Sequence, residues 1–331
     1  MTLAGKITLV TGASRGVGRG IARCLGEAGA TVYVTGRTVQ HGAEAEPGSI
    51  QHVAREVDAL GGTGIPVRCD HGVDAEVGEL FGRIEKESGR LDILVNNAHS
   101  GVRDLYEGAG QRFWETPPDF WDHMNRVGLR AHYVASVYAA RMMVPRRSGL
   151  IVNVSSFGSL SYLPSMAYGV GKAALDRMTA DMAIELRRFA VAVVSIWPGI
   201  VRTEMTAPLA EQATPGYRRI LDAYAESPIV SGRAVVALAS DPGVLRLSGR
   251  AVIAAEVARR HGLRDEDGSL PLSPRSFRRL ATALLPGGWR WFAALVPPGN
   301  VPLWLARPIV SRCSEILKEK GSYRRGGDGA S

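Results

Sequence analysis

A strand pattern that runs straight into a glycine-rich loop near the start of the chain constrains the fold more than any other feature. The apolar residues Ile7–Val10 are followed at once by Thr11-Gly-Ala-Ser-Arg-Gly-Val-Gly18, and a helical pattern begins inside this loop. Glycines at such a turn let the backbone approach a ligand closely, and the amino end of the following helix attracts an anion. A tight turn without a ligand is the alternative, which the position between a strand and a helix disfavours.

Strand and helix patterns alternate from this loop to about residue 254. We expect strands at 6–11, 31–35, 64–68, 91–96, 150–154, 191–197 and 249–254, and helices at 17–28, 49–60, 75–87, 118–143 and 168–189. This order is typical of an α/β protein, a Rossmann-like doubly wound parallel sheet in a single domain at 1–255. Two long connections, 99–117 and 199–228, follow the carboxyl ends of strands, where open α/β sheets bind ligands.

Tyr168 and Lys172 are four positions apart on the last long helix, so their side chains share a face. A nearby cation favours the phenolate and is expected to lower the pKa of Tyr168 from about 10. The phenol then becomes a usable proton donor or acceptor. A solvated helix face explains this spacing alone, but the spacing together with the glycine loop indicates hydride transfer to or from a dinucleotide.

The end of the second strand bears on the choice of dinucleotide. An acidic residue here would bind the ribose 2′-hydroxyl of NAD, but the sequence is Thr35-Gly36-Arg37. Arg37 suits a 2′-phosphate instead, and Arg15 in the glycine loop is placed to clamp the same phosphate. The sequence therefore predicts NADP(H) rather than NAD(H).

These motifs resemble those of the short-chain dehydrogenase/reductase family over roughly residues 5–255. The resemblance rests on the order of several motifs, which are the glycine loop, Asp70, Asn96-Asn97-Ala98, Ser156, Tyr168-x-x-x-Lys172 and Pro198-Gly199-x-Val201-x-Thr203.

The resemblance implies a role for each matching residue. Ser156 would polarise the substrate oxygen, Tyr168 would donate the proton, and Lys172 would bind the nicotinamide ribose. Asp70 would hold the adenine. The full set of expected cofactor-binding residues is Gly12, Ser14, Arg15, Gly16, Val17, Gly18, Arg37, Asp70, Asn97, Ala98, Tyr168, Lys172, Pro198, Gly199, Val201 and Thr203.

Three positions depart from the family pattern. His99 stands where a glycine is usual, and we interpret it as a packing residue, with a pocket wall or a pH-sensitive group as the alternative. The spacing from Ser156 to Tyr168 is 12, one shorter than is common, so Ser155 is the alternative serine. Gly128 falls where the family has an asparagine that helps to hold a water on the proton path.

Asn125 lies one helical turn before Gly128, and we expect it to substitute for that asparagine. A relay built from a backbone carbonyl and water, with a solvent-facing Asn125, is the alternative.

The expected activity is NADPH-dependent reduction of bulky apolar carbonyl compounds. The stretches 113–117, 127–130, 168–174 and 261–268 resemble one subgroup of the family, which implies steroids and similar substrates and association with the endoplasmic reticulum membrane. Aromatic residues on the predicted pocket segments agree, namely Phe113, Trp114, Trp121, Tyr162 and Tyr217, with Met205 and Leu209 beside them. The alternatives are an NADP-dependent alcohol dehydrogenase of a lipid or secondary metabolite and a membrane-peripheral NADPH-binding protein with little turnover.

The segment 256–331 differs from the rest in composition. It holds 13 Lys and Arg against 7 Asp and Glu, and three of the six tryptophans, Trp289, Trp291 and Trp304. The uncharged stretch 291–306 is shorter than the ~20 residues that span a bilayer. We expect a flap over the active site or, by a slight preference, contact with an anionic membrane surface or a hydrophobic partner.

The cysteine spacing and the first apolar residues bear on where the protein is located and what it binds. Cys24, Cys69 and Cys313 share no metal-like spacing and are predicted to be reduced thiols. The first apolar residues form a strand rather than a signal peptide. We therefore expect a cytoplasmic protein, or one peripheral to a membrane, that binds a small molecule, no metal and no nucleic acid. By resemblance it is a homo-oligomer that pairs through the helices at 118–143 and 168–189.

Overall fold

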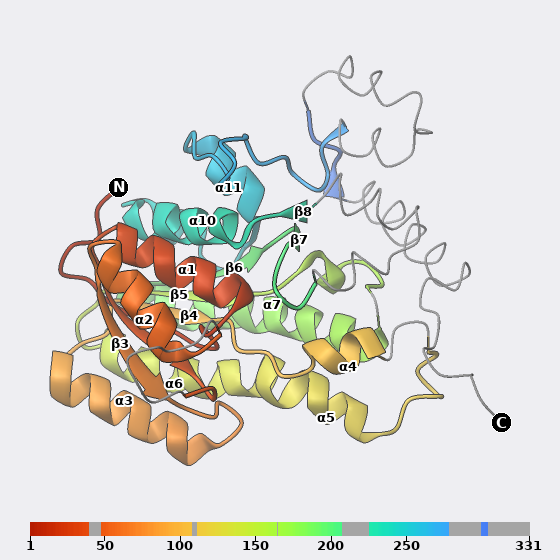
Figure 1. The fold of residues 1–331 in the computed structure, drawn as a ribbon, viewed down its shortest axis with the longest axis horizontal. Coiled ribbons are helices and arrows are strands. Elements are labelled where there is room, and N and C mark those ends of the chain that lie inside the picture. The colour runs from red at the N-terminus through yellow and green to blue at the C-terminus, as the bar shows by residue number, and fades with distance from the viewer. Residues whose placement is uncertain (40–47, 108–110, 164, 207–224, 278–298, 304–331) are drawn as a thin grey trace.

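A seven-stranded parallel sheet with helices on both faces makes up the protein in the computed structural model (Figure 1), which describes residues 1–39, 48–107, 111–163, 165–206, 225–277 and 299–303. The strand order is β3-β2-β1-β4-β5-β6-β9. The strands are β1 (Ile7–Val10), β2 (Thr31–Gly36), β3 (Thr63–Arg68), β4 (Ile93–Asn96), β5 (Gly149–Val154), β6 (Val191–Trp197) and β9 (Ala251–Ile253). The predicted doubly wound fold is confirmed.

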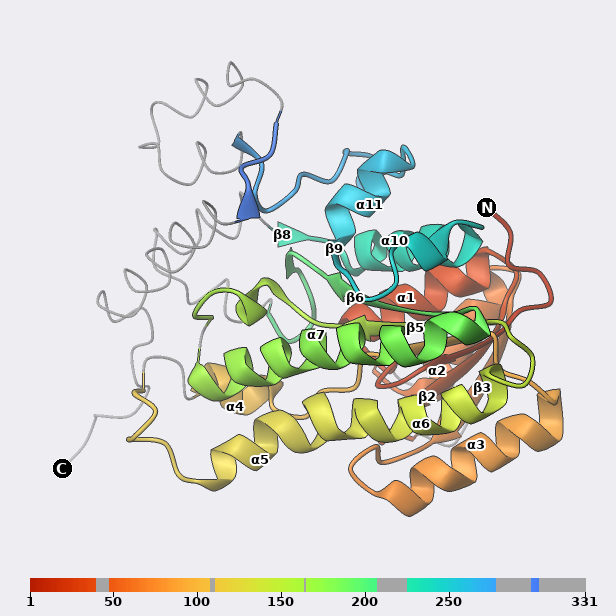
Figure 2. The same ribbon diagram turned by 180° about the vertical axis from the view of Figure 1, so that it is seen from behind.

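Helices form a layer on each face of this sheet. One layer holds α1 (Gly16–Glu27), α2 (Ile50–Ala59), α10 (Pro228–Ser240) and α11 (Ala254–Arg260), whose buried residues belong to one hydrophobic cluster. The other layer, in front in Figure 2, holds α3 (Asp74–Ser88), α6 (Ala131–Met143) and α7 (Met166–Leu186), which share a second cluster. Covered on both faces, β4 and β6 are buried along their whole length, which explains their continuous apolar sequences.

The sheet has its switch point between β1 and β4. Chain order runs outward from β1 through β2 to β3 on one side and from β4 to β9 on the other. Ligands of open α/β sheets bind in the crevice outside the carboxyl ends of the strands at such a point. The glycine loop after β1 and Asn97 after β4 both lie there.

The helix expected at 118–143 is interrupted. The structure has α5 (Asp119–Asn125), a π-helical turn at Arg126–Arg130, and then α6. A π turn carries one extra residue and often marks a functional site within a helix. The turn begins directly after Asn125 and has Gly128 at its centre.

The two long connections contain short elements that the sequence pattern did not predict. The connection after β4 holds α4 (Val102–Glu107). The connection after β6 begins with β7 (Ile200–Val201), which pairs in parallel with β8 (Ala225–Glu226). Leu209 and Tyr217, expected in this connection, lie outside the described residues.

The C-terminal extension begins within α11, and residues 273–277 and 299–301 are anchored to that helix. The carboxylate of Glu256 accepts hydrogen bonds from Arg275 Nε at 2.6 Å and Arg275 Nη2 at 2.8 Å. Ser276 and Asn300 form an antiparallel bridge, and Val301 is buried. Trp289, Trp291, Trp304 and Cys313 lie outside the described residues. Within the described ranges, no helix is both long enough and apolar enough to cross a membrane.

Candidate active site

The glycine loop is packed tightly against the end of β4. Thr11 Oγ1 accepts hydrogen bonds from the backbone N–H groups of Asn97, at 2.9 Å, and Ala98, at 3.0 Å. Asn97 Nδ2 donates to the carbonyls of Thr11 and Gly12, both at 2.9 Å. Gly12 has φ +64°, and a Cβ there would lie 2.7 Å from Ala98 Cα. Glycine is therefore required at position 12.

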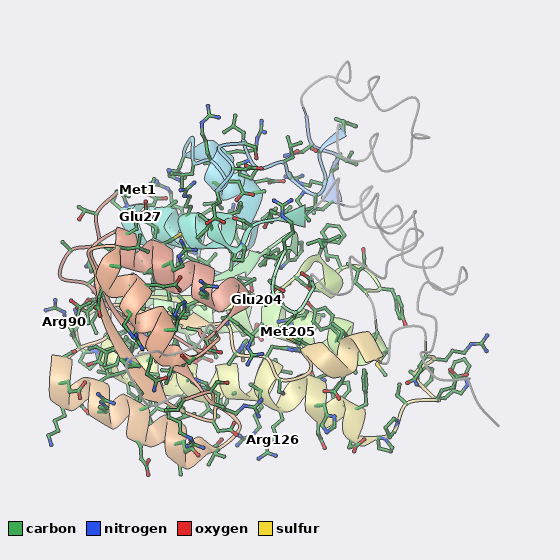
Figure 3. All side chains as sticks on the ribbon, in the orientation of Figure 1. Met1, Glu27, Arg90, Arg126, Glu204 and Met205 are labelled. Atoms are coloured by element: carbon green, nitrogen blue, oxygen red, sulfur yellow. The ribbon has the colours of Figure 1, made fainter. Side chains whose placement is uncertain are left out.

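The amino end of α1 already holds an anionic group. Figure 3 labels Glu204 and Met205 beside this end of the helix. Glu204 accepts from the Gly16 N–H at 3.1 Å and from Arg19 Nη1 at 3.1 Å. Burial alone would raise the pKa of Glu204, but these hydrogen bonds outweigh it and the pKa is lowered. The residues present thus fit the pyrophosphate of a dinucleotide, which needs the same donors.

The structure brings Arg15 to the end of β2. Arg15 Nη2 donates to Thr38 Oγ1 at 3.4 Å, and Thr38 follows the exposed Arg37. The structure thus places the Arg15 side chain beside the end of β2, at the residue next in sequence to Arg37. Asp70 follows β3, and its carboxylate accepts from the Gly72 N–H at 2.9 Å.

The connection after β6 reaches back to the glycine loop. A Cβ on Gly16 would lie 3.5 Å from Thr203 Cγ2, so Thr203 lies directly over the start of α1. Gly199 N–H donates to Glu226 at 2.9 Å, which fixes the turn after Pro198. Val201 is buried in β7. These residues form the end of the crevice next to β6.

Ser156 and Tyr168 meet although they come from different elements. Ser156 follows β5 and accepts from the Gly158 N–H at 3.1 Å. Tyr168 lies in the first turn of α7, which Ser165 caps by accepting from the Tyr168 N–H at 3.3 Å. The two side-chain hydroxyl groups are hydrogen-bonded. A Cβ on Gly158 would lie 2.9 Å from Ser156 Oγ and 3.0 Å from Tyr168 Cε1, so only glycine leaves room for the pair.

The alternative serine points elsewhere. Ser155 is buried, and its hydroxyl donates to the backbone carbonyl of Lys172 at 3.3 Å. It holds β5 against α7 and is not beside the phenol of Tyr168. The short spacing between Ser156 and Tyr168 therefore does not move the neighbouring serine into the site.

Lys172 is buried beneath Tyr168. Its Nζ donates to the carbonyl of Val154 at 2.9 Å and lies 5.7 Å from the centre of the Tyr168 ring. Burial lowers the pKa of Lys172 to about 8, and the nearby charge of Asp176 opposes this shift.

The pKa of Tyr168 shifts in the direction opposite to the expected one. Burial raises it, and the hydrogen bond with Ser156 opposes the rise without cancelling it. The ammonium lies against the ring and is held by the Val154 carbonyl. The expectation that Lys172 lowers the pKa of Tyr168 is therefore not met in this structure.

Asn125 joins two helices. Its side chain is buried, and Nδ2 donates to the carbonyls of Trp121 at 3.2 Å and Ala167 at 3.3 Å. Its Oδ1 lies against the backbone of Gly171, next to Lys172, where any Cβ would collide with it. Asn125 is thus close to the lysine, but both amide hydrogens are already used by backbone carbonyls.

Two departures from the family pattern compensate each other in space. A Cβ on Gly128 would lie 2.5 Å from Cδ2 and 3.0 Å from Nε2 of His99. The imidazole thus fills the space that a side chain at position 128 would need. The centres of the His99 and Tyr168 rings are 5.8 Å apart in an edge-to-face arrangement. From the sequence alone, we interpret His99 and Gly128 separately. A large side chain at one position together with a glycine at the other is the signal that could have predicted this contact.

The expected pocket aromatics lie at the surface. Phe113 and Trp114 are 61% and 64% exposed and contact each other edge to face, with Arg112 over the Trp114 ring. Trp121 and Tyr162 are also exposed. Among the described residues, no group of three or more His, Cys, Asp and Glu side chains is placed to hold a metal.

Comparisons with known proteins agree with this geometry. The family model described as short chain dehydrogenase matches residues 6–214. The human protein named dehydrogenase/reductase SDR family member 1 is 46% identical over 316 residues, which cover 93% of this chain and 98% of that protein. The mouse protein of the same name is 49% identical over 271 residues, covering 80% and 84%.

A solved structure extends the agreement to three dimensions. The crystal structure of a short-chain type dehydrogenase/reductase from Mycobacterium marinum has a TM-score of 0.65 and 27% identity, and the match covers 76% of this chain and 94% of that one. The predicted resemblance, including that to the subgroup, is confirmed. The chain belongs to the short-chain dehydrogenase/reductase family of oxidoreductases, which use nicotinamide cofactors and small-molecule substrates.

Proposed function

We propose that this protein is an NADPH-dependent reductase of ketones or aldehydes on bulky apolar molecules, such as steroid-like compounds, lipids or xenobiotics. The observation that carries the proposal is the meeting of Ser156, Tyr168 and Lys172 in a fold that also carries the glycine loop. Ser156 follows β5, whereas Tyr168 and Lys172 lie one turn apart on α7, so the fold must bring these two segments together.

The residues would act as follows. NADPH, when bound, supplies the hydride that reduces the carbonyl carbon. Ser156 and Tyr168 donate hydrogen bonds to the substrate oxygen, where negative charge develops. Tyr168 then transfers its proton to that oxygen, a step that contributes about 10²–10⁴-fold in other enzymes. Because burial raises the pKa of Tyr168, the phenol is protonated at neutral pH and suited to act as an acid.

The preference for NADPH is supported by charge at the end of β2. The exposed Arg37 follows that strand directly, and Arg15 reaches the adjacent Thr38. No carboxylate stands at this strand end to bind a ribose 2′-hydroxyl. Two guanidinium groups suit the 2′-phosphate of NADPH, because a planar guanidinium can bind phosphate in a bidentate manner.

Assembly and membrane contact belong to the same proposal. The outer faces of α6 and α7 expose Tyr133, Val170 and Ile184, which are 54%, 45% and 77% accessible. Exposed apolar side chains on these two helices support pairing with a second copy of the chain. Contact of the segment 256–331 with a membrane rests on its composition, because its tryptophans lie outside the described residues.

An assay of NADPH oxidation across a panel of carbonyl compounds tests the function directly. We expect steady turnover with at least one bulky ketone or aldehyde, and weaker turnover when NADH replaces NADPH. The reverse assay, with the matching alcohols and NADP⁺, covers the alcohol dehydrogenase alternative. An absence of turnover in both directions, with NADPH bound, would favour a low-turnover binding protein instead.

A further inference from the structure

His99 contacts the ring of Tyr168 but has no part in the proton donation and hydride transfer proposed above. It follows Ala98 at the end of β4, and its ring lies between Gly128 of the π-helical turn and the ring of Tyr168. His132 fixes the backbone before it, because the His132 Nε2 lies 2.9 Å from the Ala98 carbonyl and donates to it. The imidazole of His99 is therefore held in place on three sides.

One nitrogen of this ring lacks a partner. Nδ1 of His99 is buried and makes no hydrogen bond to any described residue, and the same is true of Nδ1 of His132. Buried polar atoms are nearly always hydrogen-bonded, either to protein or to ordered water. A polar site with several such atoms is where a buried water is expected, since such a water makes two to four hydrogen bonds.

His99 and Lys172 both lie against Tyr168: the centre of the phenol ring is 5.8 Å from that of the imidazole and 5.7 Å from Lys172 Nζ. Burial, together with the lysine charge, lowers the pKa of His99 to about 3 and that of His132 to about 3. The imidazoles are therefore neutral, and an unprotonated ring nitrogen can accept a hydrogen bond. The Lys172 ammonium has three N–H groups, and among the described residues only the Val154 carbonyl accepts from it.

Asn125 is less suited to hold a water here. Its two amide hydrogens are used by the carbonyls of Trp121 and Ala167. Gly128 has no side chain, and the imidazole of His99 takes up the space beside it. His99, by contrast, contacts Tyr168 and has a buried ring nitrogen, Nδ1, that makes no hydrogen bond to a described residue.

We propose that His99 is a positioning residue whose Nδ1 holds a buried water that supplies protons to Lys172 and, through it, to Tyr168. This inference rests on the proposed function. Each reduction moves one proton from the phenol to the substrate oxygen, and one solvent proton must replace it. Lys172 passes an N–H proton toward the phenolate and takes one from the water, which is reprotonated from solvent. The imidazole is neutral before and after.

Two substitutions separate this role from packing. His99→Phe keeps a ring against Gly128 and Tyr168 but removes both nitrogens, whereas His99→Asn keeps a polar atom near the position of Nδ1. We expect His99→Phe to lower kcat by at least about 10-fold, in the range of lost proton transfer, while His99→Asn stays within about threefold of wild type. The KM for NADPH should stay unchanged in both. The exposed His261→Phe serves as the matched control.

A solvent isotope effect sharpens the test. In His99→Phe, proton supply should become rate-limiting, so the ratio of kcat in H₂O to kcat in D₂O should rise above the wild-type ratio. Unchanged kcat and isotope effect in His99→Phe would overturn the inference, as would an equal loss in the Phe and Asn variants. If Tyr168→Phe is inactive and His99→Phe is not, the inference fails while the proposed function stands.

A crystal structure of the wild-type protein tests the proposed water site independently of enzyme activity. We expect an ordered water at about 2.7–3.2 Å from His99 Nδ1. A direct protein partner on Nδ1, or no water beside it, would overturn the inference even if the enzyme reduces carbonyl compounds. If the water is present but the protein shows no measurable turnover, the water site is supported and the proposed function fails.

Discussion

At the scale of single residues, burial sets the protonation of the candidate site. Lys172 is buried and Tyr168 is half-buried between β5, α5 and α7, and burial disfavours the charged form of each. The pKa of the phenol is therefore raised and that of the ammonium is lowered to about 8. At neutral pH the tyrosine holds its proton and most of the lysine is charged, which is the state that proton donation requires.

This balance predicts the pH dependence of reduction. Lys172 is charged below its pKa of about 8 and neutral above it, so kcat for reduction should fall as pH rises through that value. Asp176, one helical turn away, opposes the shift and keeps it from going further. A steady-state pH profile measures this directly. The residual activity of Lys172→Arg should lack the fall, because a guanidinium stays charged. A wild-type kcat that stays level to about pH 10 would contradict the prediction.

We propose that cofactor choice also depends on single side chains. Arg37→Asp should lower the ratio of kcat/KM for NADPH to that for NADH by roughly 10- to 100-fold, which corresponds to losing a hydrogen bond to a charged group. The exposed Arg187→Asp, at the carboxyl end of α7, carries the same charge change and should leave the ratio unaltered. The assignment of Arg37 is wrong if both variants keep the wild-type ratio.

At the scale of elements, the π-helical turn between α5 and α6 gives the candidate site room for the side chain of His99. The turn places Gly128 against His99, and the absence of a side chain there makes room for the imidazole. A helix that continued unbroken from α5 would present its residues in a different register. The turn, the glycine and the histidine therefore form one unit.

Adding a methyl group inside this unit should destabilise the protein. The Cβ of Gly128→Ala would lie 2.5 Å from His99 Cδ2, and overpacking of this kind costs about 1–3 kcal/mol. Chemical denaturation measures the free energy of unfolding. Combining Gly128→Ala with His99→Ala should remove most of the extra cost, because the two positions share one space.

A second glycine-to-alanine change provides the control for that experiment. Gly82 is exposed on α3, and a Cβ added there would meet nothing within 4 Å. Gly82→Ala should stabilise the protein by about 0.5–1 kcal/mol, because alanine favours the helix. Equal effects of the two substitutions would show that Gly128 does not hold the close contact with His99.

At the scale of the whole molecule, residues 273–277 and 299–301 are tied to α11, the helix in which the extension begins. Glu256 on α11 binds Arg275 through both carboxylate oxygens and also accepts from Ser273 at 2.7 Å. Burial would raise the pKa of Glu256, but these hydrogen bonds outweigh it and lower the pKa. The strand-like pairing of residues 275–277 with 299–301 follows directly from this anchor.

Removing the anchor should loosen that pairing and leave the sheet intact. In Glu256→Ala, the amides of Phe277 and Val301, which donate to Gly299 and Arg275, should exchange hydrogen roughly 10-fold faster or more. Amides of β4 and β6 should keep wild-type exchange. Glu85→Ala, at an exposed position on α3, is the matched control. Unchanged exchange at Phe277 would mean that other contacts hold the extension.

The sequence predicted the sheet well because its central strands, such as β4 and β6, are buried along their whole length and therefore appear as short apolar runs. It did not predict α10, whose buried residues surround the helix and leave no amphipathic pattern. The π-helical turn was also missed, because one extra residue does not disturb the helical pattern enough to be seen. The compensation between His99 and Gly128 joins positions 29 residues apart, and only the folded chain brings them together.

Pairing between Ser156 and Tyr168 could be expected from the motifs, whereas the electrostatics of the site could not. The motif suggests that the lysine acts on the phenol, but the depth of burial determines the direction of the shift. Burial depends on α5 and on the connection after β5, which no single motif describes.

The proposed function depends above all on Tyr168 donating the proton in an NADPH-dependent reduction. Single-turnover measurement of NADPH oxidation with the best carbonyl substrate tests it most directly, in wild type and Tyr168→Phe. We expect a loss of about 10²–10⁴-fold in the variant, with NADPH binding unchanged. Hydride transfer at the wild-type rate in Tyr168→Phe would contradict it.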